Sequence, residues 1–229
     1  MNHSGWLRVI AIIFPYFILV GLFQFAGAVI AEVPFSNPEF QESTTQHLIM
    51  ITFSFLGTML LIWLFMKFVD KEPFIEVGLQ IKNKGKDIVI GTILGLTIMF
   101  LAYLGLSLSN EIFFDKLNFN FSELFYTTLL FVLVAVLEEV LFRGYILKNL
   151  MLSFNKYLAL TISAALFALM HGANPNISWF SLLGLFLAGM ALGASYIYTK
   201  NLWYPIAFHF SWNLFQSLFG FNVSGQDIY

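Results

Sequence analysis

Five ionisable side chains lie within long apolar stretches of the second half of the chain, and an asparagine follows the last of them by four residues. In chain order they are Glu138, Glu139, Arg143, His171 and His209, and the asparagine is Asn213. An ionisable residue inside a bilayer is costly and is a functional candidate by default. A carboxylate, two imidazoles and an amide suit hydrolysis of a peptide bond, because they supply a base for water and hydrogen-bond donors for an oxyanion.

Helical spacing separates the two adjacent glutamates. Glu139 and Arg143 are four residues apart, so they share a helix face and are predicted to form a supporting ion pair. Glu138 is turned about 100° away and is predicted to face a cavity. The alternative is a buried ion-pair network with a further carboxylate near the membrane interface, which would be structural only.

The two histidines also have partners at helical spacing. His209 and Asn213 share one face, and Phe167 shares a face with His171. We expect Glu138, assisted by His171, to remove a proton from water, while His209 and Asn213 donate hydrogen bonds to the oxyanion. A lone intramembrane histidine can instead serve only as a hydrogen bond between helices.

A zinc site is the alternative use of the same residues. Glu138, His171 and His209 would leave an open position for water on the metal. We predict that no cofactor is required, because tight zinc sites usually show clearer local ligand spacing. The sequence contains no H-E-x-x-H, no G-x-S-G and no G-x-G-D pattern.

The elements that must position these residues are membrane helices. The chain is 59% hydrophobic and only 10% charged, whereas soluble domains are about one-quarter charged. A spanning helix needs about 20 mostly apolar residues. Seven candidate spans cover residues 6–31, 47–68, 88–108, 124–147, 157–171, 179–199 and 202–220. We predict an all-α, polytopic integral membrane helix bundle of about seven transmembrane helices.

The distribution of basic residues predicts the orientation. Ten of the 11 Lys and Arg residues lie toward one side of the predicted spans, and only Lys116 lies on the other side. Cytoplasmic loops are enriched in Lys and Arg. We therefore expect the N-terminus in the cytoplasm and the C-terminus outside, with the active site opening toward the cytoplasm.

Three regions are expected along the chain. Residues 1–123 hold the N-terminal helices and a basic cytoplasmic loop, 124–220 form the catalytic core, and 221–229 are a short tail. The polar stretch 70–87 is interpreted as a solvated loop, with a short interfacial segment as the alternative. Gly189 and Gly193 form a small-xxx-small pair, which favours close packing between helices of the same chain.

Charge and cysteine content exclude several classes of function. The formal net charge is −2 and no strong basic cluster is present, so no nucleic-acid partner is expected. Without cysteine the chain has no disulfide, no thiolate metal site and no cysteine nucleophile.

Three motifs resemble those of the CPBP family, the CAAX proteases and bacteriocin-processing enzymes, also called Abi proteins. Residues 138–143 fit E-E-x-x-x-R, 167–171 fit F-x-x-x-H, and 209–213 fit H-x-x-x-N. The motifs occur in order on separate predicted helices, and the resemblance covers roughly 124–220. It implies an intramembrane endopeptidase with Glu138 as water activator, His171 assisting, and His209 and Asn213 at the oxyanion. The family is commonly labelled metalloprotease, although a metal-free glutamate mechanism is also attributed to it.

The expected substrate is a membrane-embedded or lipidated peptide or protein within the lipid bilayer. The chain shows no organelle signal, so we expect a bacterial plasma membrane and a substrate such as a peptide leader, a pheromone precursor or a membrane-protein segment. The competing hypothesis is a non-enzymatic transport or immunity protein that uses the buried polar groups for binding or gating. Transporters commonly contain inverted repeats and broken helices, and the sequence shows neither.

Overall fold

The computed structural model describes residues 4–34, 40, 42–116, 119–174 and 177–223. Within these ranges the chain is helical and contains no β-strand. The α-helices are α1 (Gly5–Ile30), α2 (Thr44–Phe65), α3 (Gly85–Leu108), α4 (Phe121–Glu139), α5 (Lys148–Ser153), α6 (Lys156–Met170), α7 (Trp179–Thr199) and α8 (Trp203–Leu218). Short π or 3-10 turns are η1 (Met66–Asp70), η2 (Phe74–Val77), η3 (Val140–Leu147) and η4 (His171–Ala173).

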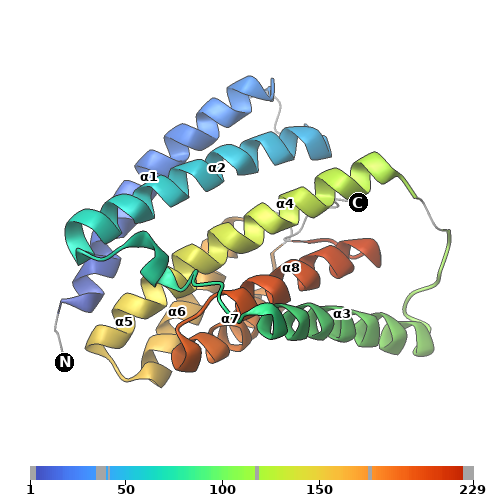
Figure 1. Cartoon of the computed structure of the whole chain (residues 1–229). Helices are drawn as coiled ribbons and strands as arrows, with labels where there is room; N and C mark the ends of the chain where they lie inside the picture. The colour runs from blue at the N-terminus through green and yellow to red at the C-terminus, as the bar shows by residue number, and fades with distance from the viewer. Residues whose placement is uncertain (1–3, 35–39, 41, 117–118, 175–176, 224–229) are drawn as a thin grey trace.

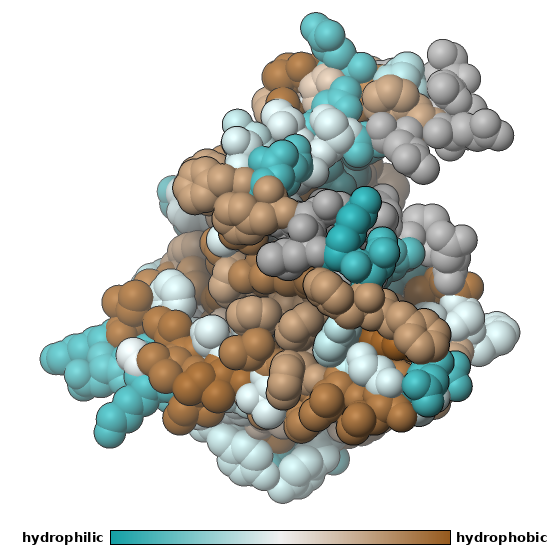
Figure 2. Space-filling model, turned by 90° about the vertical axis from the view of Figure 1, so that its right-hand side faces the viewer, coloured by the Kyte–Doolittle hydropathy of each residue, from teal (hydrophilic) through white to brown (hydrophobic). Residues whose placement is uncertain are grey.

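The prediction of a multi-pass membrane bundle is confirmed. Six helices in the described residues are long and apolar enough to cross a membrane. The seventh predicted span corresponds to α8, which at 16 residues is shorter than the about 20 that a spanning helix needs. Large apolar side chains project outward, including Phe14 and Leu22 of α1. Figure 2 shows hydrophobic side chains exposed over much of one face.

Polar caps fix where several helices begin. Ser43 and Gln46 form a capping box at the start of α2. The side chains of Asn120, Asn155 and Ser178 accept backbone N–H groups at the starts of α4, α6 and α7. Each cap satisfies donors that lack a partner inside the helix, and so places the start of each run of apolar residues.

Helix α4 lies at the centre of the arrangement. It packs against α2 on one side and α8 on the other, while α1 pairs with α2, α3 lies along α8, and α6 lies along α7 (Figure 1). The continuous helical segment from α4 through η3 and α5 runs from residue 121 to 153, longer than the predicted 124–147. The helices that carry the three motifs are therefore α4 with η3, α6 and α8.

Glycines allow two of these helix pairs to approach closely. A Cβ added at Gly189 would lie 3.0 Å from the Cα of Ala164, and one at Gly193 would lie 2.5 Å from a side-chain atom of α6. The prediction that this pair serves packing within the chain is confirmed. A second pair, Gly91 and Gly95, would place a Cβ 2.6 and 2.7 Å from backbone atoms of α8. Here α3 rests directly on the α8 backbone.

The interpretation of residues 70–87 as a solvated loop is wrong for its central part. Val77, at the end of η2, is fully buried in the main core. The Tyr196 hydroxyl of α7 donates to the Val77 carbonyl at 3.0 Å, and further hydrogen bonds join the next residues to the start of α8. The apolar residues within this polar stretch therefore close the end of the bundle at which α7 ends and α8 begins.

The orientation remains a prediction, and two reporter fusions test it. A fusion after Lys86 should report the cytoplasm and one after Gly172 the exterior, because ten basic residues lie on the side of Lys86 and one on the other. An alkaline phosphatase and a green fluorescent protein fusion at each position provide matched opposite readouts. If both positions report the same compartment, the predicted topology is wrong.

Candidate active site

The helix that carries both glutamates changes its winding just after them. α4 ends at Glu139, and the π-helix η3 begins at Val140. Such wide turns inside α-helices are frequent at functional sites. Arg143 still reaches back: its Nη1 donates to Glu139 Oε1 at 2.8 Å, with the two side chains 1% and 0% exposed. The ion pair predicted from the spacing is therefore present and fully buried.

Arg143 also ties this helix to two others. Its Nη2 donates to the Gly189 carbonyl of α7 at 3.0 Å, and its guanidinium lies 4.6 Å from the ring centroid of Phe167 on α6. The Phe167 ring in turn packs edge-on against Phe142, with centroids 5.1 Å apart. The charge of Arg143 is thus met by a carboxylate, a carbonyl and an aromatic face, as burial of a guanidinium requires.

Glu139 has a second partner that helical spacing did not predict. Its Oε1 also lies 2.9 Å from Nδ1 of His209, 70 residues later on α8. A carboxylate ionised beside Arg143 is an acceptor only, so we assign the Nδ1 proton of His209 to this hydrogen bond. Glu139 therefore orients the imidazole and directs its Nε2 away from the ion pair.

His171 is held in the same way by a backbone carbonyl. Its Nδ1 lies 2.8 Å from the carbonyl oxygen of Phe167, one turn earlier on α6. A carbonyl accepts only, so the Nδ1 carries the proton and Nε2 is left with a lone pair when the ring is neutral. The ring centroids of Phe167 and His171 lie 4.7 Å apart. Phe167 thus supports His171 through both its carbonyl and its ring.

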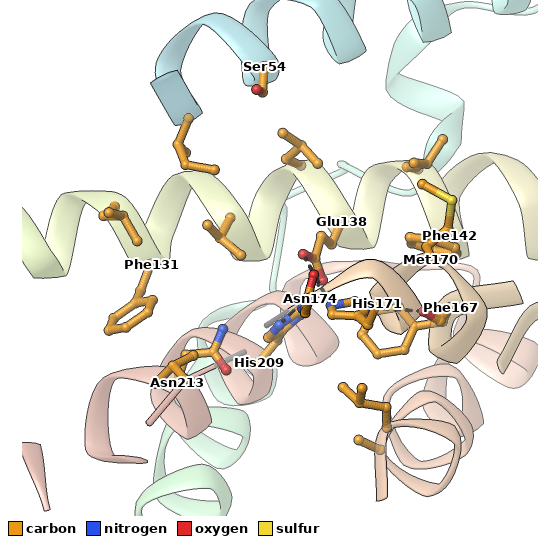
Figure 3. A pocket seen from close by; sticks show the side chains of 18 of the residues that line it. Ser54, Phe131, Glu138, Phe142, Phe167, Met170, His171, Asn174, His209 and Asn213 are labelled. Carbon is orange, nitrogen blue, oxygen red and sulfur yellow. Dashed lines mark hydrogen bonds and ion pairs between the residues drawn. The ribbon is translucent and has the colours of Figure 1, made fainter. Parts of the chain in front are cut away.

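Glu138 lies between the two imidazoles. Its Oε1 is 3.8 Å from His171 Nε2, and its Oε2 is 3.7 Å from His209 Nε2 (Figure 3). These distances are too long for direct hydrogen bonds. The Glu138 side chain is 19% exposed, and its Oε2 is buried without a hydrogen-bond partner. One carboxylate with two oriented ring nitrogens is a set of groups that can hold and deprotonate a water molecule.

A single cavity of about 610 Å³ contains all four predicted site residues. Asn213 lies one turn after His209 and is 9% exposed, and its amide points into this cavity beside the His209 ring (Figure 3). His171 begins the η4 turn directly after α6 ends at Met170, and it lines the same cavity. The three motifs therefore meet at one place.

Sequence reasoning missed other residues that line this cavity. Asn174 follows η4 and lines the same cavity as Glu138 and His209 (Figure 3). It belongs to a turn, to which helical periodicity does not apply. Tyr16 and Gln24 of α1 and His47 of α2 line the cavity as well, so the N-terminal helix pair forms part of its wall.

The zinc alternative would use Glu138, His171 and His209 as its three ligands. Zinc holds its nitrogen and oxygen ligands at about 2.0–2.2 Å, and its histidines usually donate the second ring N–H to an acceptor. His171 and His209 meet the second condition through Phe167 and Glu139. Within the described residues, however, no group of three or more His, Cys, Asp or Glu side chains is placed to hold a metal ion.

Comparison with known proteins gives one finding. Residues 120–215 match a family model described as type II CAAX prenyl endopeptidase Rce1-like. The match spans all three motifs and runs from the start of α4 into α8. Neither the search of curated proteins nor that of solved structures returned a match.

Proposed function

Residues 120–215 of this chain belong to the CPBP family, and from this premise we propose that the protein is an intramembrane endopeptidase. Membership points to CAAX-type protease activity on a membrane-associated peptide substrate. The proposed reaction is hydrolysis of a peptide bond in a membrane-embedded or lipidated precursor. The observation that carries it is the placement of Glu138 between two imidazoles whose Nδ1 atoms are already engaged.

Glu138 and His171 are proposed to activate the water. A water between Glu138 Oε1 and His171 Nε2 can donate one hydrogen bond to each, because these atoms are 3.8 Å apart. As the water oxygen attacks the substrate carbonyl carbon, its proton passes to Glu138. The protonated Glu138 then gives this proton to the leaving amine as the C–N bond breaks, and the new carboxyl group leaves with the water oxygen.

His209 and Asn213 are proposed to stabilise the oxyanion. His209 Nδ1 donates to Glu139, so the second donor that Nε2 offers to the oxyanion belongs to the imidazolium form of the ring. The Asn213 amide supplies a neutral donor from the same helix face. Donors fixed by packing in a water-poor cavity act more strongly than in bulk water, because they need not reorganise during the reaction.

Peptidomics of the membrane fraction tests the function. Cells that express the wild type should accumulate cleaved peptides that are absent from cells that express Glu138→Ala at equal membrane level. The cleavage sites should fall within or beside apolar segments, because the cavity lies among membrane helices. Identical peptide populations in the two strains, together with a phenotype unaffected by Glu138→Ala, would favour the non-enzymatic alternative.

The metal-free mechanism is a separate prediction. Purified active protein should contain far less than one equivalent of zinc, and its cleavage rate should survive chelators, because Glu138 and His171 already supply a base. The measurement is elemental analysis of the protein alongside cleavage assays before and after chelation. Stoichiometric zinc, with activity lost on chelation and restored by zinc, would establish the zinc alternative.

A further inference from the structure

The chain turns back toward the cavity after helix α8. α8 ends at Leu218, and Gly220 adopts a left-handed φ of +82°. The N–H of Gly220 donates to the Ser217 carbonyl at 2.9 Å, and that of Phe221 to the Gln216 carbonyl at 3.0 Å. This is a Schellman motif, which completes the hydrogen bonding of the helix end by Phe221. Residues 221–223 are here named the C-terminal strap. Asn222 and Val223 lie beyond the residues whose N–H groups complete the helix end.

The strap is docked on the wall of the active-site cavity. Val223 is only 4% exposed and clusters with Leu130 and Phe131 of α4. The carbonyl of Asn222 accepts a hydrogen bond from Gln216 Nε2 at 2.6 Å. Val223, Gln216, Leu130 and Phe131 all line the cavity that contains Glu138. Among the described residues, the carbonyl of Asn222 and the side chain of Val223 hold the strap against α8 and α4.

The amide donor is oriented independently of the strap. Trp212 Nε1 donates to Gln216 Oε1 at 2.9 Å, and both residues lie on α8. This bond identifies the oxygen of the amide and leaves Nε2 as the donor that faces the strap. A fixed donor for a backbone carbonyl, next to an apolar pocket for a side chain, is how extended peptides are commonly bound. Such a site tolerates many sequences, because the carbonyl belongs to the backbone.

We infer that Gln216, Leu130 and Phe131 form a subsite for an extended apolar peptide segment, and that residues 221–223 of the chain itself occupy it. The inference rests on the proposed function in one respect: the segment that would replace the strap is part of the substrate. Two peptides cannot accept the same Gln216 N–H and fill the same pocket at once. The strap therefore competes with substrate and restrains activity until it is displaced.

A binding experiment tests the subsite without reference to catalysis. The probe is a fluorescently labelled peptide with the sequence of residues 221–229, added to purified protein that lacks these residues and to the full chain. Truncated protein should bind it saturably and at least ten times more tightly than the full chain. A peptide with Val223→Asp should bind at least ten times more weakly, because it places a charge in the apolar pocket. Equal binding of the two peptides would overturn the subsite.

One variant of the full chain and one variant of the truncated protein extend the test. Full-length Val223→Asp should release the strap, so it should bind the wild-type peptide as the truncated protein does. In the truncated protein, Gln216→Glu keeps the acceptor for Trp212 but removes the donor, and should abolish peptide binding while the melting temperature stays unchanged. If full-length Val223→Asp binds no better than the wild type, the strap does not occupy the subsite.

Cleavage assays separate this inference from the proposed function. With a peptide substrate, truncated protein should show a several-fold lower KM than the full chain and an unchanged kcat. An unchanged KM would overturn the competition between strap and substrate, even if cleavage itself proceeds. Peptide binding that behaves as expected without cleavage by any variant would instead contradict the proposed function and support the subsite.

Discussion

Replacing Glu138 by glutamine should abolish peptide cleavage while leaving the protein folded. Glutamine keeps the shape of the side chain and its place between the two imidazoles, but it cannot accept the water proton. A general base typically contributes about 10²–10⁴-fold to a rate, and a loss of this size is expected in kcat. The measurement is cleavage rate and melting temperature of the variant and the wild type in the same detergent.

Stability should not fall with activity in this variant. Glu138 Oε2 is buried without a hydrogen-bond partner, and its nearest cationic candidates are histidines more than 3.5 Å away. Neutralising such a carboxylate removes a desolvation cost, so the melting temperature should be equal or higher. Glu123→Gln is the matched control, because Glu123 lies in the first turn of the same helix and does not line the cavity. Normal cleavage by Glu138→Gln would refute Glu138 as the base.

Replacing Glu139 by alanine should chiefly destabilise the fold. Its removal leaves Arg143 buried, with only a carbonyl and an aromatic face as partners. Breaking a buried ion pair on one side typically costs about 3–5 kcal/mol, so a lower folded yield and melting temperature are expected. His209 also loses the acceptor of its Nδ1 proton, so the protein that does fold should cleave more slowly.

A double variant separates these two effects. Glu139→Leu combined with Arg143→Met removes both charges, and replacement of both partners by apolar groups is often neutral for stability. The double variant should therefore recover much of the melting temperature lost in Glu139→Ala. It should not recover activity, since His209 still lacks its carboxylate. Full stability of Glu139→Ala, or normal cleavage by the double variant, would show that the assigned roles are wrong.

The sequence by itself determined the features that depend on one helix at a time. The length of the apolar runs identified the membrane spans. The six helices that are long and apolar enough to cross a membrane begin and end within about three residues of their predicted bounds. The exception is the end of the fourth helix, which continues to Ser153. The Glu139–Arg143 pair followed from a spacing of four residues. Both inferences hold because the α-helix has a fixed rise and turn, so local separation along the chain defines local geometry.

The tertiary structure alone decided how these helices meet. The bond from His209 to Glu139 spans 70 residues, and that from Tyr196 to Val77 spans 119. Neither could be derived from periodicity, since both depend on the depth and rotation of two packed helices. The same is true of the strap, where Gly220 reverses the chain and places Val223 against α4. Helical geometry fixes which side chains share a face, but only packing between helices determines what that face touches.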